Sequence, residues 1–186
     1  MKMIKNTENG YGLVAIILHW LMAITLFSLF GLGLYMVELT YYDAWYKGSL
    51  DLHKNIGMTL FVVLMLRIVW RLVNTTPKNS DKSASSVEIK AAHYAHIALY
   101  ALMLVLMLTG YLISTADGRA IDVFGLMQVP AFPFNFANQE DIAGSIHEIL
   151  AWTLILLSLG HALAALKHHF INKNNTLLRM IKPSHE

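Results

Sequence analysis

Four long runs of apolar residues, separated by polar segments, dominate the pattern along the chain. They cover about residues 12–36, 53–73, 92–114 and 142–166. Each run reaches the roughly 20 residues that a helix needs to cross the hydrocarbon core of a bilayer. None alternates polar and apolar residues with a period of two, and backbone groups in lipid must be hydrogen-bonded internally. The pattern predicts an all-α membrane protein with a bundle of four transmembrane helices.

The segments around these runs support one continuous membrane domain. The first run is too long for a signal peptide and is followed by no small-x-small cleavage site, so we keep it as a helix. The connection 74–91 is polar, and its Pro77 ends the second helix. The connection 115–141 is rich in phenylalanine and is expected to be an ordered loop at the interface. We expect a single domain over residues 1–186.

Composition agrees with this pattern and limits the chemistry. Of the 186 residues 56% are hydrophobic and 14% are charged, whereas soluble domains have about 25% charged residues. The chain has no cysteine and nine histidines. It therefore has no disulfide framework, no Cys-ligated iron–sulfur cluster and no Cys-ligated zinc. Histidine is the main chemical resource, and we expect lipid as the surroundings and no nucleic-acid partner.

The distribution of charge predicts an orientation. The N-terminus, the 67–90 region and the tail from Lys167 together carry 11 lysines and arginines. The other two loops carry three, which are Lys47, Lys54 and Arg119, along with seven acidic residues. The positive-inside rule then places both termini and the 74–91 loop in the cytoplasm.

Two histidines on the fourth predicted helix are spaced for two separate groups. His147 and His161 are fourteen residues apart, which is about four turns, so both leave nearly the same face of the helix. They lie roughly 21 Å apart along the axis and cannot share one metal ion. At matching predicted depths, His19 can face His161 and His53 can face His147. Opposed imidazoles suit a bis-His haem b, and the chain offers two such pairs.

Other roles for the histidines remain open at this stage. A histidine inside a membrane can also hydrogen-bond between helices, or it can form part of a proton or metal pathway. His93 and His96 share one helical turn and cannot lie on opposite faces of one porphyrin, so packing or a propionate contact suits them better. His168 and His169 are either cationic anchors at the interface or, for His168, a contact to a ligand near the His19/His161 pair.

Two arginines near the end of the second predicted helix have two readings. Arg67 and Arg71 are four residues apart. They either extend to lipid headgroups or pair with haem propionates, since arginine binds carboxylates in bidentate fashion. Gly57 and Gly160 leave room for a flat ring, whereas Gly33, like Gly31 and Gly110, is attributed to ordinary close packing of membrane helices.

Several stretches in this order resemble the bacterial cytochrome b561 family of small di-haem membrane cytochromes. They are "ILHW" at 17–20, "HKNIGMTLFVVLMLRIVWRL" at 53–72, "LTGYLI" at 108–113, "HEILAW" at 147–152, "GHALAALKHHF" at 160–170 and "NTLLRMIKP" at 175–183. The resemblance covers essentially the whole chain. It implies four helices and two haem b groups, whose iron ligands are His19, His53, His147 and His161. It also implies electron exchange with ubiquinone near the haem of His19 and His161, and His168 matches a residue of that region.

The resemblance also implies a choice of electron donors. Some members are superoxide oxidases that pass electrons from periplasmic superoxide to ubiquinone, and related cytochrome b subunits anchor hydrogenases and formate dehydrogenases. We expect a one-electron relay from a periplasmic donor, either superoxide or a cationic redox protein, to ubiquinone. Whether the chain is itself an oxidoreductase enzyme depends on that donor. The alternatives are an anchor subunit of a dehydrogenase or hydrogenase and, in a different class, a His-lined metal or proton transporter.

Overall fold

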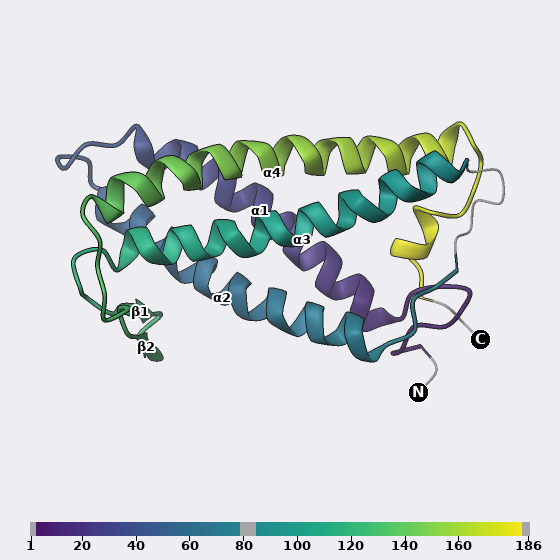
Figure 1. The fold of residues 1–186 in the computed structure, drawn as a ribbon, viewed down its shortest axis with the longest axis horizontal. Coiled ribbons are helices and arrows are strands. Elements are labelled where there is room, and N and C mark those ends of the chain that lie inside the picture. Colours follow the sequence, from purple (N-terminus) through teal and green to yellow (C-terminus); the bar gives the residue numbers. More distant parts are fainter. Residues whose placement is uncertain (1–2, 79–84, 184–186) are drawn as a thin grey trace. The chain divides into compact units, whose positions relative to one another are not determined.

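The computed structural model describes residues 3–78 and 85–183, and four long helices dominate it (Figure 1). Each of the four is long and apolar enough to cross a membrane. They are α1 Leu13–Val37, α2 Tyr46–Val73, α3 Ser86–Ser114 and α4 Gln139–Phe170. The predicted fold class, a membrane protein with four helical spans, is confirmed. The orientation stays a prediction, and Lys2 and Lys82, which were counted in it, lie outside the described residues.

Three of the helices are longer than the apolar runs predict. Helix α2 begins seven residues before His53, and α3 begins at Ser86, well before residue 92. The first turn of α3 is capped by reciprocal hydrogen bonds, because the Ser85 hydroxyl accepts from Glu88 N–H and Glu88 accepts from Ser85 N–H. Polar end turns of this kind lengthen a helix beyond its apolar run, so hydropathy does not reveal them. His53 therefore lies about two turns inside α2 and does not open it.

A small β-hairpin occupies the connection between α3 and α4, where only an ordered loop was expected. Strands β1 Ile121–Val123 and β2 Met127–Val129 pair antiparallel. In the turn between them, Phe124 and Gly125 have φ of 52° and 70°. Positive φ at two successive residues is the requirement of a type I′ turn, which glycine meets without strain. The Asn55 side chain accepts a hydrogen bond from Phe124 N–H and ties the hairpin to α2.

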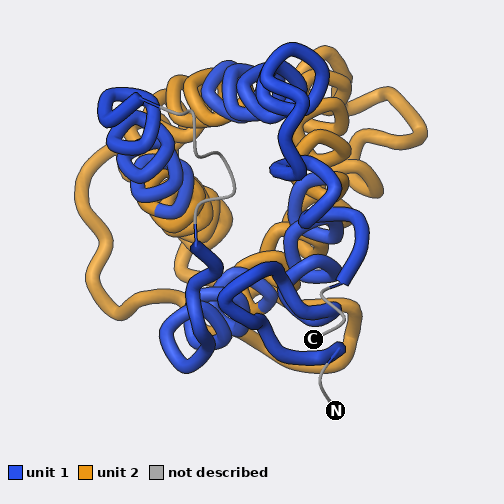
Figure 2. The backbone as a smooth tube through the Cα atoms, turned by 90° about the vertical axis from the view of Figure 1, so that its right-hand side faces the viewer, with its two compact units in different colours: residues 1–23, 63–100, 156–186 blue, residues 24–62, 101–155 orange. Residues whose placement is uncertain are grey.

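The chain forms two compact units, and every long helix contributes a segment to each (Figure 2). The first unit comprises Met1–Ala23, Val63–Tyr100 and Leu156–Glu186, and the second comprises Ile24–Val62 and Ala101–Ile155. Leu64 is fully buried in the first unit and Leu154 is nearly so in the second. Many large apolar side chains are exposed, as expected of helices whose outer faces contact lipid.

The segments near both termini are tied together within the first unit. Asn6 N–H donates to the Asn74 side chain at 3.1 Å, and Lys78 forms an ion pair with Glu8. Near the C-terminus, η1 Leu178–Met180 follows α4, and the indole of Trp20 donates to the Met180 carbonyl at 2.6 Å. These contacts fix the ends of α1 and α2 in this unit.

Candidate functional site

In the first unit, two of the predicted histidines face each other from α1 and α4. The ring centroids of His19 and His161 are 6.4 Å apart, and the ring planes make an angle of 73°. Arg67 of α2 and His96 of α3 complete the surroundings. The Arg67 guanidinium lies 3.0 Å from Nδ1 of His19, and the His96 ring centroid lies 5.1 Å from that of His161. All four helices therefore meet at this pair.

The second unit holds a matching pair on α2 and α4. The ring centroids of His53 and His147 are 6.3 Å apart, with an angle of 68° between the planes. Here the neighbours on α1 and α3 are glycines. A Cβ on Gly33 would lie 3.5 Å from Cε1 of His53, and one on Gly110 would lie 3.1 Å from Cε1 of His147. The absence of side chains at these glycines makes room for the imidazole rings.

One interval relates the two sites on every helix. Each helix contributes one residue to each site, and the two residues are fourteen positions apart: His19 and Gly33 on α1, His53 and Arg67 on α2, His96 and Gly110 on α3, and His147 and His161 on α4. Fourteen residues return a helix to nearly the same face. The sequence therefore directs one face of each helix to both histidine pairs.

Hydrogen bonding leaves Nε2 of His147 available as a ligand. Its Nδ1 lies 2.9 Å from the Leu106 carbonyl oxygen and 3.1 Å from the Thr109 hydroxyl. A carbonyl only accepts, so Nδ1 carries the proton and the lone pair of a neutral ring is on Nε2. Nδ1 of His53 is buried and has no hydrogen-bond partner among the described residues.

His19 has the opposite hydrogen-bond polarity. A guanidinium only donates, so Nδ1 of His19 accepts from Arg67, and a neutral ring then has its proton on Nε2. Arg67 also donates through Nε to the Tyr100 hydroxyl at 2.8 Å. The His19/His161 pair is thus next to a fixed cation, whereas the contacts of His147 are to uncharged groups.

The family follows from comparison with known proteins. The family model described as prokaryotic cytochrome b561 matches residues 10–183. The chain belongs to this family. It is therefore a multi-pass membrane protein of a family whose members transfer electrons, and the family implies haem b as the cofactor.

Individual relatives extend over nearly the full chain. The chain is 45% identical to "Cytochrome b561 homolog 2" of Escherichia coli K12, over 96% of this chain and 95% of that protein. It is 31% identical to "Probable superoxide oxidase CybB" of Yersinia pestis, over 94% of this chain and 97% of that protein. It is 30% identical to "Cytochrome b561 homolog 1" of E. coli K12, over 93% and 97%.

The spacing of each histidine pair fits a haem. A metal–imidazole bond is about 2.0 Å, and the bonding nitrogen lies about 1 Å from its ring centre, so two axial imidazoles have centroids about 6 Å apart. The observed 6.4 Å and 6.3 Å agree with this. The buried, unpartnered Nδ1 of His53 and the Nε2 lone pair of His147 also suit this cofactor. For His19 the fit requires Arg67 to release Nδ1, so that the proton can leave Nε2.

His96 is closer to His161 than His19 is, but its spacing suits a different role. A centroid distance of 5.1 Å leaves too little room for an iron ion between two imidazoles, given the value of about 6 Å that axial ligation requires. Among the described residues, no group of three or more His or carboxylate side chains is placed to hold a bare metal ion. The assignment of His19 as the partner of His161 stays a prediction, and the distances support it.

The remaining predicted residues lie around the first unit. Arg71 places its guanidinium carbon 5.3 Å from the centre of the Tyr100 ring. His168 is bonded through Nδ1 to the Asn172 side chain at 3.1 Å, and His93 is exposed on α3. The propionate role of Arg67 and Arg71 and the quinone role of His168 are not tested by these contacts, so they stay predictions.

All three basic residues of the predicted outer loops line one polar pocket of about 570 Å³ in the second unit. Lys47, Lys54 and Arg119 share it with Asp51, Asp117 and Asp122, so these six side chains have a formal sum of zero. Lys54 pairs with Asp51 at 2.9 Å. Hydrogen bonds from Arg119 lower the pKa of Asp117, and the same contact raises the pKa of Arg119. Lys47 has no ion-pair partner within the described ranges.

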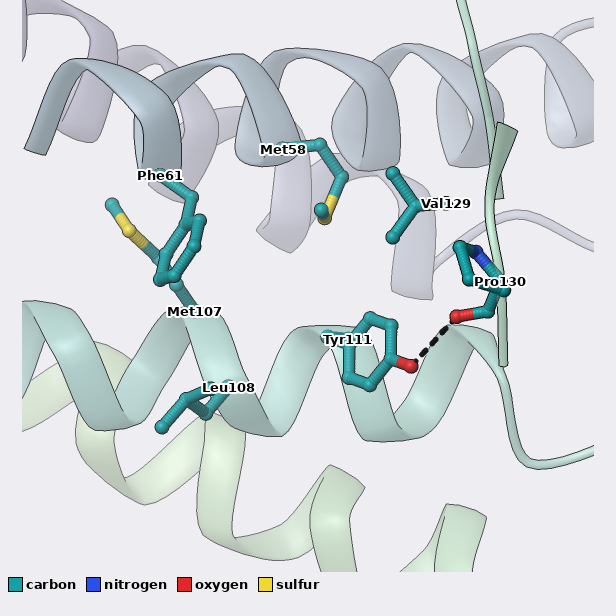
Figure 3. Close-up of a pocket in the computed structure, with 7 residues that line it drawn as sticks. All are labelled: Met58, Phe61, Met107, Leu108, Tyr111, Val129 and Pro130. Atoms are coloured by element: carbon teal, nitrogen blue, oxygen red, sulfur yellow. Dashed lines mark hydrogen bonds between the residues drawn. The ribbon is translucent and has the colours of Figure 1, made fainter. Parts of the chain in front are cut away.

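A second cavity, of about 310 Å³, is apolar (Figure 3). Its lining comes from α2, α3 and the segment at β2: Met58, Phe61, Met107, Leu108, Tyr111, Val129 and Pro130. The Tyr111 hydroxyl donates to the Pro130 carbonyl at 2.8 Å (Figure 3). Such a lining suits hydrocarbon. The cavity belongs to the second unit, whereas His168 belongs to the first.

Two residues at the His53/His147 pair were not recognised from the sequence as parts of that site, and one contact at the other pair was not foreseen. Gly33 and Gly110 were attributed to ordinary helix packing, and Arg67 was not expected to contact His19. The fourteen-residue interval could have indicated all three, because each is that distance from a histidine on its own helix.

Proposed function

We propose that the chain is a di-haem b cytochrome that relays single electrons across the bacterial inner membrane. One haem would be held by His53 and His147 and the other by His19 and His161. The observation that carries this proposal is the presence of two histidine pairs with nearly equal spacing, one in each compact unit. Family membership supports haem b as the cofactor.

The residues of the chain have distinct roles in this function. Bound haem supplies reversible one-electron chemistry at its iron. The two histidines of each pair would hold the iron of one haem, and Leu106 orients His147 through its carbonyl oxygen. Gly33 and Gly110 leave space for the rings of His53 and His147. The surrounding apolar helices exclude water.

The proposal assigns a direction across the membrane. The distribution of lysine and arginine supports cytoplasmic termini, because the positive-inside rule applies to short loops of this kind. The His53/His147 pair then lies toward the periplasm, and the His19/His161 pair lies toward the cytoplasm. Ubiquinone would be reduced near the second pair, with His168 as a hydrogen-bonding contact to its headgroup.

For the donor, we propose superoxide. The relative named as a probable superoxide oxidase supports this choice. So does Lys47, which lines the polar pocket in the unit of the His53/His147 pair and has no ion-pair partner among the described residues. Two superoxide ions would each give up one electron and leave as dioxygen. Those two electrons, with two protons, convert one ubiquinone to ubiquinol. The chain would then be a superoxide:ubiquinone oxidoreductase.

A spectrum and a haem assay of the purified protein test the proposal. We expect two haem b per chain in the pyridine haemochromogen assay and a sharp b-type α band on reduction. A colourless protein that binds zinc would favour the metal transporter. Copurification of a large dehydrogenase subunit would favour the anchor subunit. One haem per chain would rule out the di-haem relay.

A further inference from the structure

Arg67 places a permanent positive charge beside one of the two histidine pairs. It is half-buried on α2, it donates to Nδ1 of His19 at 3.0 Å, and its second hydrogen bond goes to the neutral hydroxyl of Tyr100. Arginine stays protonated in proteins, so this charge does not depend on pH in the physiological range.

No described carboxylate of the first unit neutralises this charge. The two described acidic residues of this unit are Glu8 and Glu88, and they pair with Lys78 and Lys167, respectively. Arg71 adds a second cation, because its guanidinium lies over the same Tyr100 ring as that of Arg67. Among the described residues, the protein groups around His19 and His161 therefore carry a net positive charge.

The His53/His147 pair has different surroundings. The contacts of His147 are to the Leu106 carbonyl and the Thr109 hydroxyl, both uncharged. The nearest charges along the chain are Lys54, which is paired with Asp51, and Glu148, which is exposed. Donation from Nδ1 of His147 to a carbonyl also makes its imidazole a stronger electron donor to a bound metal.

We infer that Arg67 makes the haem of His19 and His161 the stronger electron acceptor of the two, an inference that rests on the proposed di-haem function. An oxidised haem iron has one more positive charge than a reduced one. A nearby fixed cation therefore disfavours the oxidised form and raises the reduction potential, and the effect is larger where the dielectric constant is low. The Leu106 carbonyl, which accepts a hydrogen bond from His147, lowers the reduction potential of the other haem.

The consequence is a preferred direction of electron flow. Electrons that enter at the His53/His147 haem move to a higher potential at the His19/His161 haem, next to the proposed quinone site. The effect depends on the nearby charge and not on the Arg67–His19 hydrogen bond itself. It therefore persists when Arg67 releases Nδ1 for ligation.

Potentiometric titration followed by visible spectroscopy tests this inference. We expect two midpoint potentials in the wild type, with the higher one lower in Arg67→Gln and nearly unchanged in Arg67→Lys, which keeps the charge. Tyr100→Phe removes a hydrogen bond to Arg67 but no charge, so it should leave both midpoints in place. In a His53→Ala chain, which should retain only the His19/His161 haem, Arg67→Gln should lower the single remaining midpoint.

The possible outcomes distinguish a failure of this inference from a failure of the proposed di-haem function. If Arg67→Gln binds two haems and its higher midpoint is unchanged or raised, or only the lower midpoint moves, the inference is wrong and the di-haem function stands. If the wild type binds one haem, the proposed function itself fails. If Arg67→Gln loses a haem, the same titration is made on Arg71→Gln. A lower value of the higher midpoint in that variant supports the role of the cations, and an unchanged value overturns it.

Discussion

Arg67 lies fourteen residues after His53 on α2, the same interval that separates His147 from His161 on α4. One helix face thus presents an imidazole to one histidine pair and a guanidinium to the other. On α1 the imidazole is at the other pair: His19 faces His161, and Gly33 lies next to His53. The ligands of the two proposed haems therefore come from α4 with α2 in one case and from α4 with α1 in the other.

Both proposed haems take one ligand from α4, but the second ligand is on α2 for one haem and on α1 for the other. Single variants of these second ligands should therefore remove the two haems separately. We expect His53→Ala to lose one haem and His19→Ala to lose the other, so that each variant retains about half of the wild-type haem. The measurement is the pyridine haemochromogen assay together with the midpoint potential of the haem that remains. Loss of the same haem in both variants would show that the pairing is wrong.

Two other histidines are controls for that experiment. His93 is exposed, and His96 contacts His161 at a distance too short for shared axial ligation. We expect His93→Ala and His96→Ala to retain both haems. A missing haem in either variant would overturn the ligand assignment.

Gly110 should be essential for the His53/His147 haem although it binds nothing. A Cβ at this position would lie 3.1 Å from Cε1 of His147, closer than ordinary van der Waals contact. We expect Gly110→Leu to displace the ring and remove one haem, and Gly110→Ala to alter the spectrum more mildly. The matched control is Gly31→Leu, because no heavy atom of the described residues lies within 4 Å of a Cβ there, apart from its chain neighbours and the nearby backbone of its own helix. Equal haem loss in both leucine variants would point to a general defect in helix insertion.

His168 should influence quinone reduction without affecting the haems. Loss of one hydrogen bond to the headgroup, worth about 1 kcal/mol, slows the reaction about fivefold. We therefore expect His168→Ala to reduce ubiquinone several-fold more slowly in a stopped-flow assay, with both haems bound and reducible. His169 points about 100° away around the helix and provides the control. Unchanged kinetics in His168→Ala would exclude this residue from the quinone site.

Lys47 should contribute more to superoxide capture than Lys54, because Lys54 is already paired with Asp51. Electrostatic steering raises association rates by about 10- to 1,000-fold and weakens as salt screens the charges. We expect haem reduction by superoxide to slow with added salt, and to be slower at low salt in Lys47→Gln and in the Lys47→Gln/Lys54→Gln double variant. Lys173→Gln, in the other unit, should behave as wild type.

The opposite dependence on salt would identify a different donor. The predicted outer loops carry seven acids against three bases, and this surface as a whole would repel superoxide. A wild-type rate that rises with salt would mean that these acids dominate, and would favour a cationic redox protein. No reduction at any salt concentration would remove superoxide as the donor while leaving the quinone-linked cytochrome in place.

The four helices were predictable from the sequence because each apolar run alone is long enough to span a bilayer. Their ends were less predictable, since the turn at Glu88 is stabilised by a capping hydrogen bond that hydropathy does not register. The hairpin was missed because β1 and β2 have three residues each, too few for a periodic pattern. Its turn depends on the backbone conformation of Phe124 and Gly125.

The histidine pairs could be anticipated from depth, because rise per residue converts sequence position into depth within a membrane helix. The contacts around them could not. Whether Gly33 faces His53 or lipid depends on the rotation of α1 about its own axis, which the sequence of α1 leaves undetermined. The contact of Arg67 with His19 depends in addition on the choice of side-chain rotamer.

The common interval on all four helices restricts where the chain can change in length. A residue inserted into the connection 115–138 leaves every interval intact. A residue inserted between Leu154 and Ile155 turns the following part of α4 by about 100° and carries His161 away from His19, while His147 keeps its place. Natural variation in length within this architecture should therefore be confined to the connections, and the helix centres should accept substitutions but neither insertions nor deletions.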